Sequence, residues 1–189
     1  YDRNRPFYNT MSPSMDILIS SNLERLLFAC TNHDDQQVRQ YMESLAANGR
    51  YEVSEPVKKL LSSTFAAGFC DDAATWTMIG RMWKEHHYLI DPHTAVAFHV
   101  LEEYRRESED STPTLVVSTA SPFKFCDNVL SALGKKPQTG IDVIPQLSET
   151  AGVSAPPSLA ALKDKTVRFH DSIQRDAMPG KVCAFLNGG

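Results

Sequence analysis

The stretch TPTLVVSTASPFKFCDNVLSALG, residues Thr112–Gly134, decides which fold we expect. It begins with the apolar, β-branched run 114–119, which predicts a short strand because turn-forming residues flank it. The small residues 118–121 follow, and the spacing of residues 122–133 predicts a helix that ends at Gly134. Small hydroxyl residues at the end of a buried strand are typical of a ligand site, although a tight turn before a helix would use the same residues.

Most of the remaining chain shows the apolar spacing of amphipathic helices. We predict helices at 23–30, 34–48, 54–68, 72–88, 91–104, 145–150, 157–163 and 173–186, the last interrupted at residues 178–180. The run 114–119 is the one clear strand, and its composition indicates burial on both faces, as in a parallel sheet. Because a stable sheet needs three or more strands, its partners are weakly signalled or lie outside this sequence. The expected fold class is therefore α/β, rich in helix and with few strands.

The composition is that of a globular protein without an obvious charged partner. The chain has 189 residues, 42% of them hydrophobic, and a net charge of −4, which fits one domain or two small ones. The sequence lacks the basic stripe that would predict a nucleic-acid partner, and it lacks an apolar run long enough to predict a membrane span. Four scattered cysteines favour the reducing cytoplasm. The sequence begins YDRNRPFYNT, without methionine, so we expect a piece of a longer protein.

Three short patterns could carry chemistry. Asn22 and Arg25 follow two serines at a predicted helix start, and together they could bind an anion or simply form a helix cap with a surface arginine. His93 lies in the first turn of the helix that begins at Asp91-Pro92, where a polar side chain can face a ligand. Ser121 and Lys124 match the S-x-x-K pattern of serine nucleophiles, but its companion motifs are missing, so we interpret this as chance. The histidine and cysteine spacings predict no metal site.

Three longer stretches carry a family resemblance. NTMSPSMDILISSNLERLLF (9–28), DPHTAVAFHVLEEY (91–104) and PTLVVSTASPFKF (113–125) resemble signatures of threonine synthases, in the family's order. The resemblance implies a pyridoxal-phosphate enzyme of fold type II that converts O-phospho-L-homoserine and water to L-threonine and phosphate. It also implies that this chain is a C-terminal fragment, and that the lysine forming the Schiff base and the loop holding the cofactor phosphate lie upstream. The fragment alone is then expected to be inactive.

The resemblance assigns roles to particular residues. Thr119, or else Ser118, would donate a hydrogen bond to the pyridine nitrogen of the cofactor. Ser12, Asp16, Asn22 and Arg25 would lie beside the substrate phosphate, and His93 near the cofactor and substrate. Residues 1–140 would belong to the cofactor-binding α/β domain, and 141–189 to a helical extension of it. The alternatives are another fold-type-II lyase, such as a threonine dehydratase, and a non-catalytic helical interaction domain.

Overall fold

Three helices near the N-terminus form the first of two packed groups in the computed structural model, which describes residues 1–188. They are α1 (Leu23–Cys30), α2 (Asp35–Asn48) and α3 (Glu55–Thr64), preceded by the short 3-10 helix η1 (Pro13–Met15). Their shared core consists of Leu27, Tyr41, Leu45, Tyr51 and Val57. Tyr51 stacks between Tyr1 and Tyr41, with ring centroids 5.3 and 5.4 Å away. We call this the α1–α3 group.

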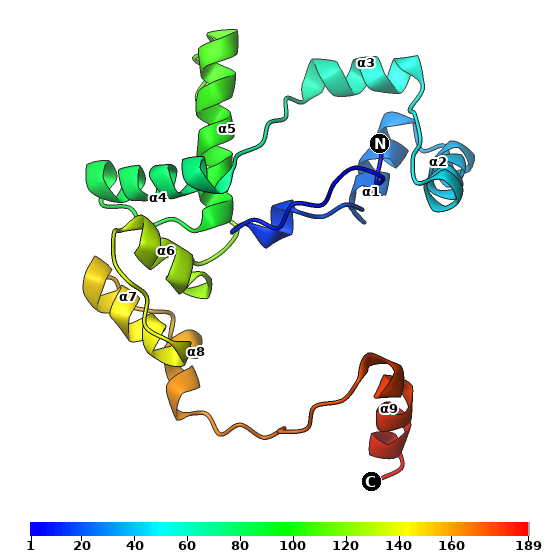
Figure 1. Cartoon of the computed structure of the whole chain (residues 1–189). Coiled ribbons are helices and arrows are strands. Elements are labelled where there is room, and N and C mark those ends of the chain that lie inside the picture. The colour runs from blue at the N-terminus through cyan, green and yellow to red at the C-terminus, as the bar shows by residue number, and fades with distance from the viewer. Residues whose placement is uncertain (189) are drawn as a thin grey trace.

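The second group packs around α4 (Asp72–His86) and α5 (Pro92–Ser108). It continues through η2 (Pro122–Lys124), α6 (Cys126–Ala132), η3 (Gly140–Asp142), α7 (Val143–Ala151), α8 (Pro157–Ala160) and η4 (Ala161–Asp164). Ile79, Val129, Leu130 and Leu147 are fully buried at its centre. We call this the α4–α8 group. Figure 1 shows the two groups side by side, joined by the chain before α4 and by the segment around η1.

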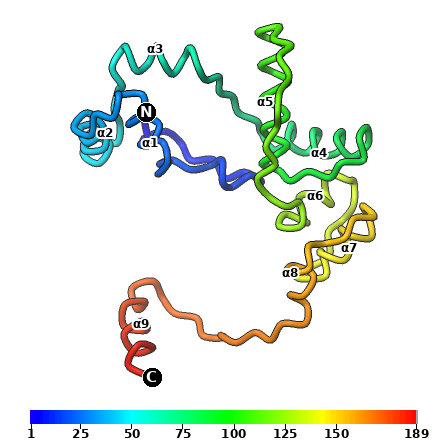
Figure 2. Tube along the Cα trace, turned by 180° about the vertical axis from the view of Figure 1, so that it is seen from behind, coloured from blue at the N-terminus to red at the C-terminus, as the bar shows by residue number. Residues whose placement is uncertain are grey.

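The C-terminal helix stands apart from both groups. An extended segment leaves η4 and leads to η5 (Arg175–Ala177) and α9 (Met178–Leu186). Both views place α9 away from the remaining helices (Figures 1 and 2). No described residue of α9 is buried. Hydrophobic side chains of this arm are therefore open to solvent, Phe169 and Phe185 among them.

The helix starts that the sequence predicted are confirmed where an aspartate caps them. Asp34, Asp71 and Asp91 each accept a hydrogen bond from a backbone N–H of the first turn. At the other end of α2, Gly49 has a φ of +73°, and the Asn4 side chain fills the place that a Cβ would take. A larger residue at 49 would be strained and would also displace Asn4.

The predicted strand at 114–119 is wrong for the described chain. The segment is extended but pairs with no strand within residues 1–188, and Leu115 and Val117 are 87% and 64% exposed. It instead runs back along α5, because Arg105 donates to the Thr112 carbonyl and to Thr114 Oγ1, at 3.3 and 3.0 Å. A strand needs a neighbour for its backbone bonds, and the described part of the chain supplies none. The helix-rich part of the expected fold class is confirmed.

Several helix boundaries also differ from expectation: α5 continues to Ser108 rather than ending at 104, and α9 begins at Met178 rather than at 173. α3 ends at Thr64 rather than at Gly68, with Phe65 already extended. The predicted helix 122–133 is divided at Phe125, whose φ of −131° is not helical. Residues 178–180 do not interrupt the last helix: they form the first turn of α9, where a proline is tolerated because its missing N–H has no helical partner.

Candidate functional site

The first turn of α5 contains a buried acidic residue and a buried histidine. Asp91 is fully buried, and Pro92 follows it as the first residue of the helix. Asp91 Oδ1 accepts a hydrogen bond from the His93 backbone N–H and lies 2.9 Å from His93 Nδ1. Among residues 1–188, His93 is the ion-pair partner that reaches Asp91, and no lysine or arginine does. Because Asp91 caps the N-terminus of α5, its carboxylate also lies at the positive end of the helix dipole.

The hydrogen bonds of His93 define its tautomer. Ser14 N–H donates to His93 Nε2 at 3.2 Å, so Nε2 must be the acceptor nitrogen. A neutral imidazole carries its proton on one nitrogen, so Nδ1–H donates to Asp91 Oδ1. The ring packs against Phe125, with centroids 4.8 Å apart. His93 thereby links α5 to η1, 79 residues earlier in the chain.

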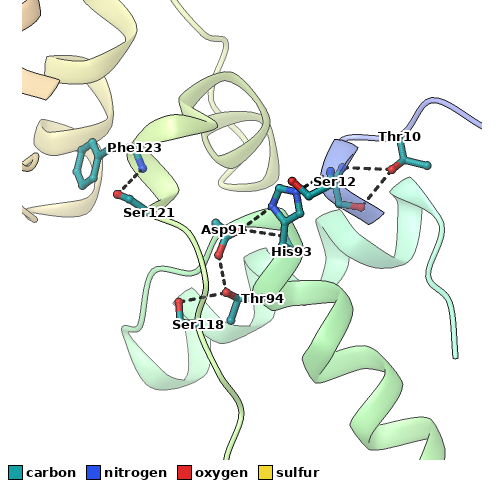
Figure 3. A network of polar contacts seen from close by, with 9 residues as sticks. Thr10, Ser12, Asp91, His93, Thr94, Ser118, Ser121 and Phe123 are labelled. Atoms are coloured by element: carbon teal, nitrogen blue, oxygen red, sulfur yellow. Dashed lines mark hydrogen bonds and ion pairs between the residues drawn. The ribbon is translucent and has the colours of Figure 1, made fainter. Parts of the chain in front are cut away.

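Thr94 connects this turn to the extended segment. Its hydroxyl donates to Asp91 Oδ2 and lies 3.1 Å from Ser118 Oγ. Figure 3 shows Asp91, His93, Thr94 and Ser118 as one continuous network. The end of the segment 112–118 is thus held against the start of α5, although no strand pairs with it among the described residues.

A second network joins the residues on either side of η1. Asp16 accepts from the Thr10 backbone N–H at 2.8 Å and from the Thr10 hydroxyl at 2.7 Å. Ser12 is buried, and its hydroxyl lies 3.1 Å from Thr10 Oγ1. The Met11 backbone N–H donates to Asp72 at 3.0 Å, which holds this segment on α4. Of the predicted site residues, Ser12 lies near His93 (Figure 3), and Asp16 is linked to Ser12 through Thr10.

Asn22 and Arg25 lie elsewhere. Both are exposed, Asn22 caps α1 without a side-chain hydrogen bond, and Arg25 lines an open groove of the α1–α3 group. Glu24 and Asp35 line the same groove, and their carboxylates lower its affinity for an anion. Figure 1 shows α1 beside α2, whereas the His93 network lies at the start of α5. The structure does not bring this predicted pair together with the other candidates.

Thr119 and Ser121 flank the network without joining it. Thr119 is exposed, directly after Ser118. Ser121 accepts from Phe123 N–H at 3.3 Å and so caps η2. The sequence predicted that the helix start 91–94 lies near the cofactor, but it did not predict the hydrogen bonds that join Thr94 to Asp91 and to Ser118. The first turn that Asp91 and Thr94 share with His93 was the available signal.

Within residues 1–188, no group of three or more histidine, cysteine, aspartate or glutamate side chains is placed to hold a metal ion. Over the same residues, no helix has the length and apolar character that crossing a membrane requires.

Comparisons with known proteins show which family the chain resembles. The sequence model described as "Threonine synthase, C-terminal" matches residues 94–178, which include Thr94 and Ser118. A solved structure of PLP-bound threonine synthase from Brucella melitensis is 34% identical, has a TM-score of 0.67, and is matched over 87% of this chain and 32% of its own. The chain is related to the threonine synthases and matches the C-terminal part of that family.

Two more relatives extend the match along the chain. The yeast threonine synthase structure covers all of the chain at 26% identity, with a TM-score of 0.76, and is itself covered over 38%. "Threonine synthase-like 1" of Pongo abelii is 32% identical over 97% of the chain. The chain spans about a quarter of the length of that relative, 24%.

Proposed function

We propose that this chain is the C-terminal part of a threonine synthase, which as a whole protein converts O-phospho-L-homoserine and water to L-threonine and phosphate in the cytoplasm. The observation that carries the proposal is the similarity to the PLP-bound enzyme of Brucella melitensis, at 34% identity over 87% of the chain. Residues 1–140 would belong to the cofactor-binding domain and 141–189 to its helical extension. The rest of the protein would supply the lysine and the glycine-rich loop.

The residues at the end of the extended segment fit a pyridoxal-phosphate ring. Pyridoxal phosphate supplies an electron sink for charge that develops beside the substrate amine. Thr119 has an exposed hydroxyl that can donate to a ring nitrogen, and the neighbouring Ser118 is fixed in place by Thr94. A neutral hydroxyl donor leaves that nitrogen unprotonated, which tempers the sink. We assign this contact to Thr119 ahead of Ser118.

The contact at Thr119 is tested with two variants of the whole protein. Thr119→Val keeps the shape of the side chain and removes the donor. The dissociation constant of the cofactor should therefore rise about ten- to a hundredfold, which corresponds to about 1–3 kcal/mol. Thr119→Ser keeps the donor and should bind nearly as the wild type does. If Thr119→Val lowers the melting temperature but leaves cofactor affinity unchanged, the residue only shapes the turn.

The proposed substrate contacts fall into two sets that need separate tests. Ser12, Asp16 and His93 lie near one another, and we place the reacting end of the substrate there. Arg25 with Asn22 would contact the phosphate. In the whole protein Arg25→Ala should lower the specificity constant about tenfold or more, since a charge-assisted bond contributes about 1.5–3 kcal/mol. Arg39→Ala is the matched control, because Arg39 is an exposed arginine of the same group that pairs with Asp35.

The reaction itself is tested on the protein encoded by the complete reading frame. With pyridoxal phosphate and O-phospho-L-homoserine, phosphate and L-threonine should form in equal amounts. Formation of 2-oxobutyrate from threonine would assign a dehydratase instead, and no reaction with either substrate would favour a non-catalytic helical domain. The present chain should be inactive alone. A stoichiometric, borohydride-trapped adduct on one of its lysines would contradict that expectation.

A further inference from the structure

In the polar network at the start of α5, the donor and the acceptor of each hydrogen bond can be assigned. Thr94 Oγ1 carries one proton, and that proton is donated to Asp91 Oδ2. The 3.1 Å contact between Thr94 Oγ1 and Ser118 Oγ must then use the proton of Ser118. The Ser118 hydroxyl therefore directs its proton to Thr94 along the contact drawn in Figure 3, and this network does not use the lone pairs of Ser118.

The charge state of Asp91 that this direction requires follows from its surroundings. Both carboxylate oxygens accept: Oδ1 from the His93 backbone N–H and from Nδ1–H, Oδ2 from the Thr94 hydroxyl. Each contact brings its own proton, so no proton on Asp91 is needed to complete the set. Asp91 is fully buried, and a buried carboxylate without such donors would be strongly unfavourable.

The residues that flank η1 repeat the same arrangement independently. Thr10 donates its hydroxyl proton to Asp16 Oδ1, so the 3.1 Å contact between Ser12 Oγ and Thr10 Oγ1 must use the proton of Ser12. Ser12 is 3% exposed, and its lone pairs also remain free. Two carboxylate–threonine–serine relays thus leave serine oxygens as acceptors on either side of His93 (Figure 3).

We propose that Asp91 and Asp16, acting through Thr94 and Thr10, fix Ser118 and Ser12 as hydrogen-bond acceptors, so that this site takes ligand groups that donate hydrogen bonds, such as an ammonium or a hydroxyl group. A phosphate dianion, which only accepts, is not matched at these two serines. This rests on the proposed function only for the identity of the ligand. It gives Ser12 an amine or hydroxyl group as its contact at the reacting end of the substrate, and it leaves Thr119 as the donor for a ring nitrogen.

Exchange of one carboxylate for an amide reverses one relay and leaves the other unchanged. In Asp91→Asn, the amide oxygen can still face His93, and the NH₂ group then donates to Thr94 Oγ1. Thr94 must in turn donate its hydroxyl proton to Ser118 Oγ. The Ser118 hydroxyl then rotates, so that its own proton points away from Thr94. Asparagine is as good a helix cap as aspartate, so α5 should still form. Asp16→Asn should reverse the Thr10–Ser12 relay in the same way.

Neutron diffraction from deuterium-exchanged crystals of this chain reads these directions. In the wild type, the Ser118 deuteron should lie on the line to Thr94 Oγ1, and the Ser12 deuteron on the line to Thr10 Oγ1. Asp91→Asn should turn only the Ser118 deuteron away, and Asp16→Asn only that of Ser12. Each variant is thus the matched control of the other.

Two outcomes would overturn the proposal. One is a wild-type Ser118 deuteron that points away from Thr94, and the other is unchanged deuterons in Asp91→Asn. If Asp91→Asn does not fold, Thr94→Val keeps the helix and removes the acceptor, and the Ser118 deuteron should then leave that line; a deuteron that stays would refute the relay. None of these readouts involves cofactor or turnover, so failure of the proposed reaction would leave them unaffected.

Discussion

Replacement of Thr94 by valine isolates the hydroxyl that joins the buried carboxylate to the extended segment. Thr94 is 1% exposed, and valine has nearly the same shape, so the change removes a hydrogen bond without opening a cavity. Asp91 Oδ2 would lose its only protein donor among the described residues. A hydrogen bond to a charged group contributes about 1.5–3 kcal/mol, so we expect the free energy of unfolding of the α4–α8 group to fall by about 2 kcal/mol.

The two tryptophans of the chain make this group easy to follow. Trp76 and Trp83 both lie on α4, so tryptophan fluorescence reports urea unfolding of the α4–α8 group and not of the α1–α3 group. With a urea dependence of about 2 kcal/mol per molar, the midpoint should fall by about 1 M. Ser118 would also lose its anchor, so amide exchange across 114–118 should become faster.

Thr75→Val is the matched control. Thr75 is also 1% exposed and lies in the same packed group, but its hydroxyl donates to the Asp71 backbone carbonyl, a neutral acceptor that also serves the Thr75 N–H. Its loss should cost about 1 kcal/mol or less. The reasoning fails if Thr94→Val lowers the midpoint no more than Thr75→Val does.

Three further predictions test the cores and the buried titratable groups. Leu147→Ala should lower the unfolding free energy of the α4–α8 group by about 2–5 kcal/mol, and so lower the urea midpoint of tryptophan fluorescence. Leu27→Ala should leave that midpoint unchanged and speed amide exchange in the α1–α3 group. Burial raises the pKa of the Cys126 thiol to about 11, so iodoacetamide at pH 8 should alkylate exposed Cys183 and spare Cys126, read by mass spectrometry. Burial raises the pKa of Tyr51 to about 12. The contribution of Tyr51 to the unfolding free energy of the α1–α3 group is therefore full below pH ~10 and should be lost as the pH rises toward 12. Tyr51→Phe should reduce this loss, measured by urea titrations followed by circular dichroism.

The helices were predictable because their signals are local. Asp34, Asp71 and Asp91 cap the first turn of their own helices, within three residues in the sequence, and need no partner from elsewhere. The strand prediction for 114–119 was wrong because the β-propensity of these residues takes effect only beside another strand. Leu115 has the composition of a buried strand residue, yet the described chain offers nothing to cover it.

The candidate site was only partly readable for a similar reason. His93 and Ser118 were predicted separately, but the contact that joins them spans 24 residues, from Thr94 to Ser118, and the bond that joins His93 to Ser14 spans 79. Adjacency in the sequence was also misleading, since Asn22 and Arg25 follow Ser12 closely and yet lie with α2. Sequence reasoning identified polar side chains, and the fold decides which of them meet.

The contacts along α5 explain how helices alone can hold one edge of a ligand site. Arg105 holds Thr112 and Thr114 near the C-terminal end of α5, and Thr94 holds Ser118 at its start. The segment between them is thus fixed against the helix at both ends, while its backbone pairs with no strand among residues 1–188. In the whole protein that we propose, strands from the missing part would add to this segment. Ser118 would already be in position, because its place depends on Asp91 and Thr94 rather than on a sheet.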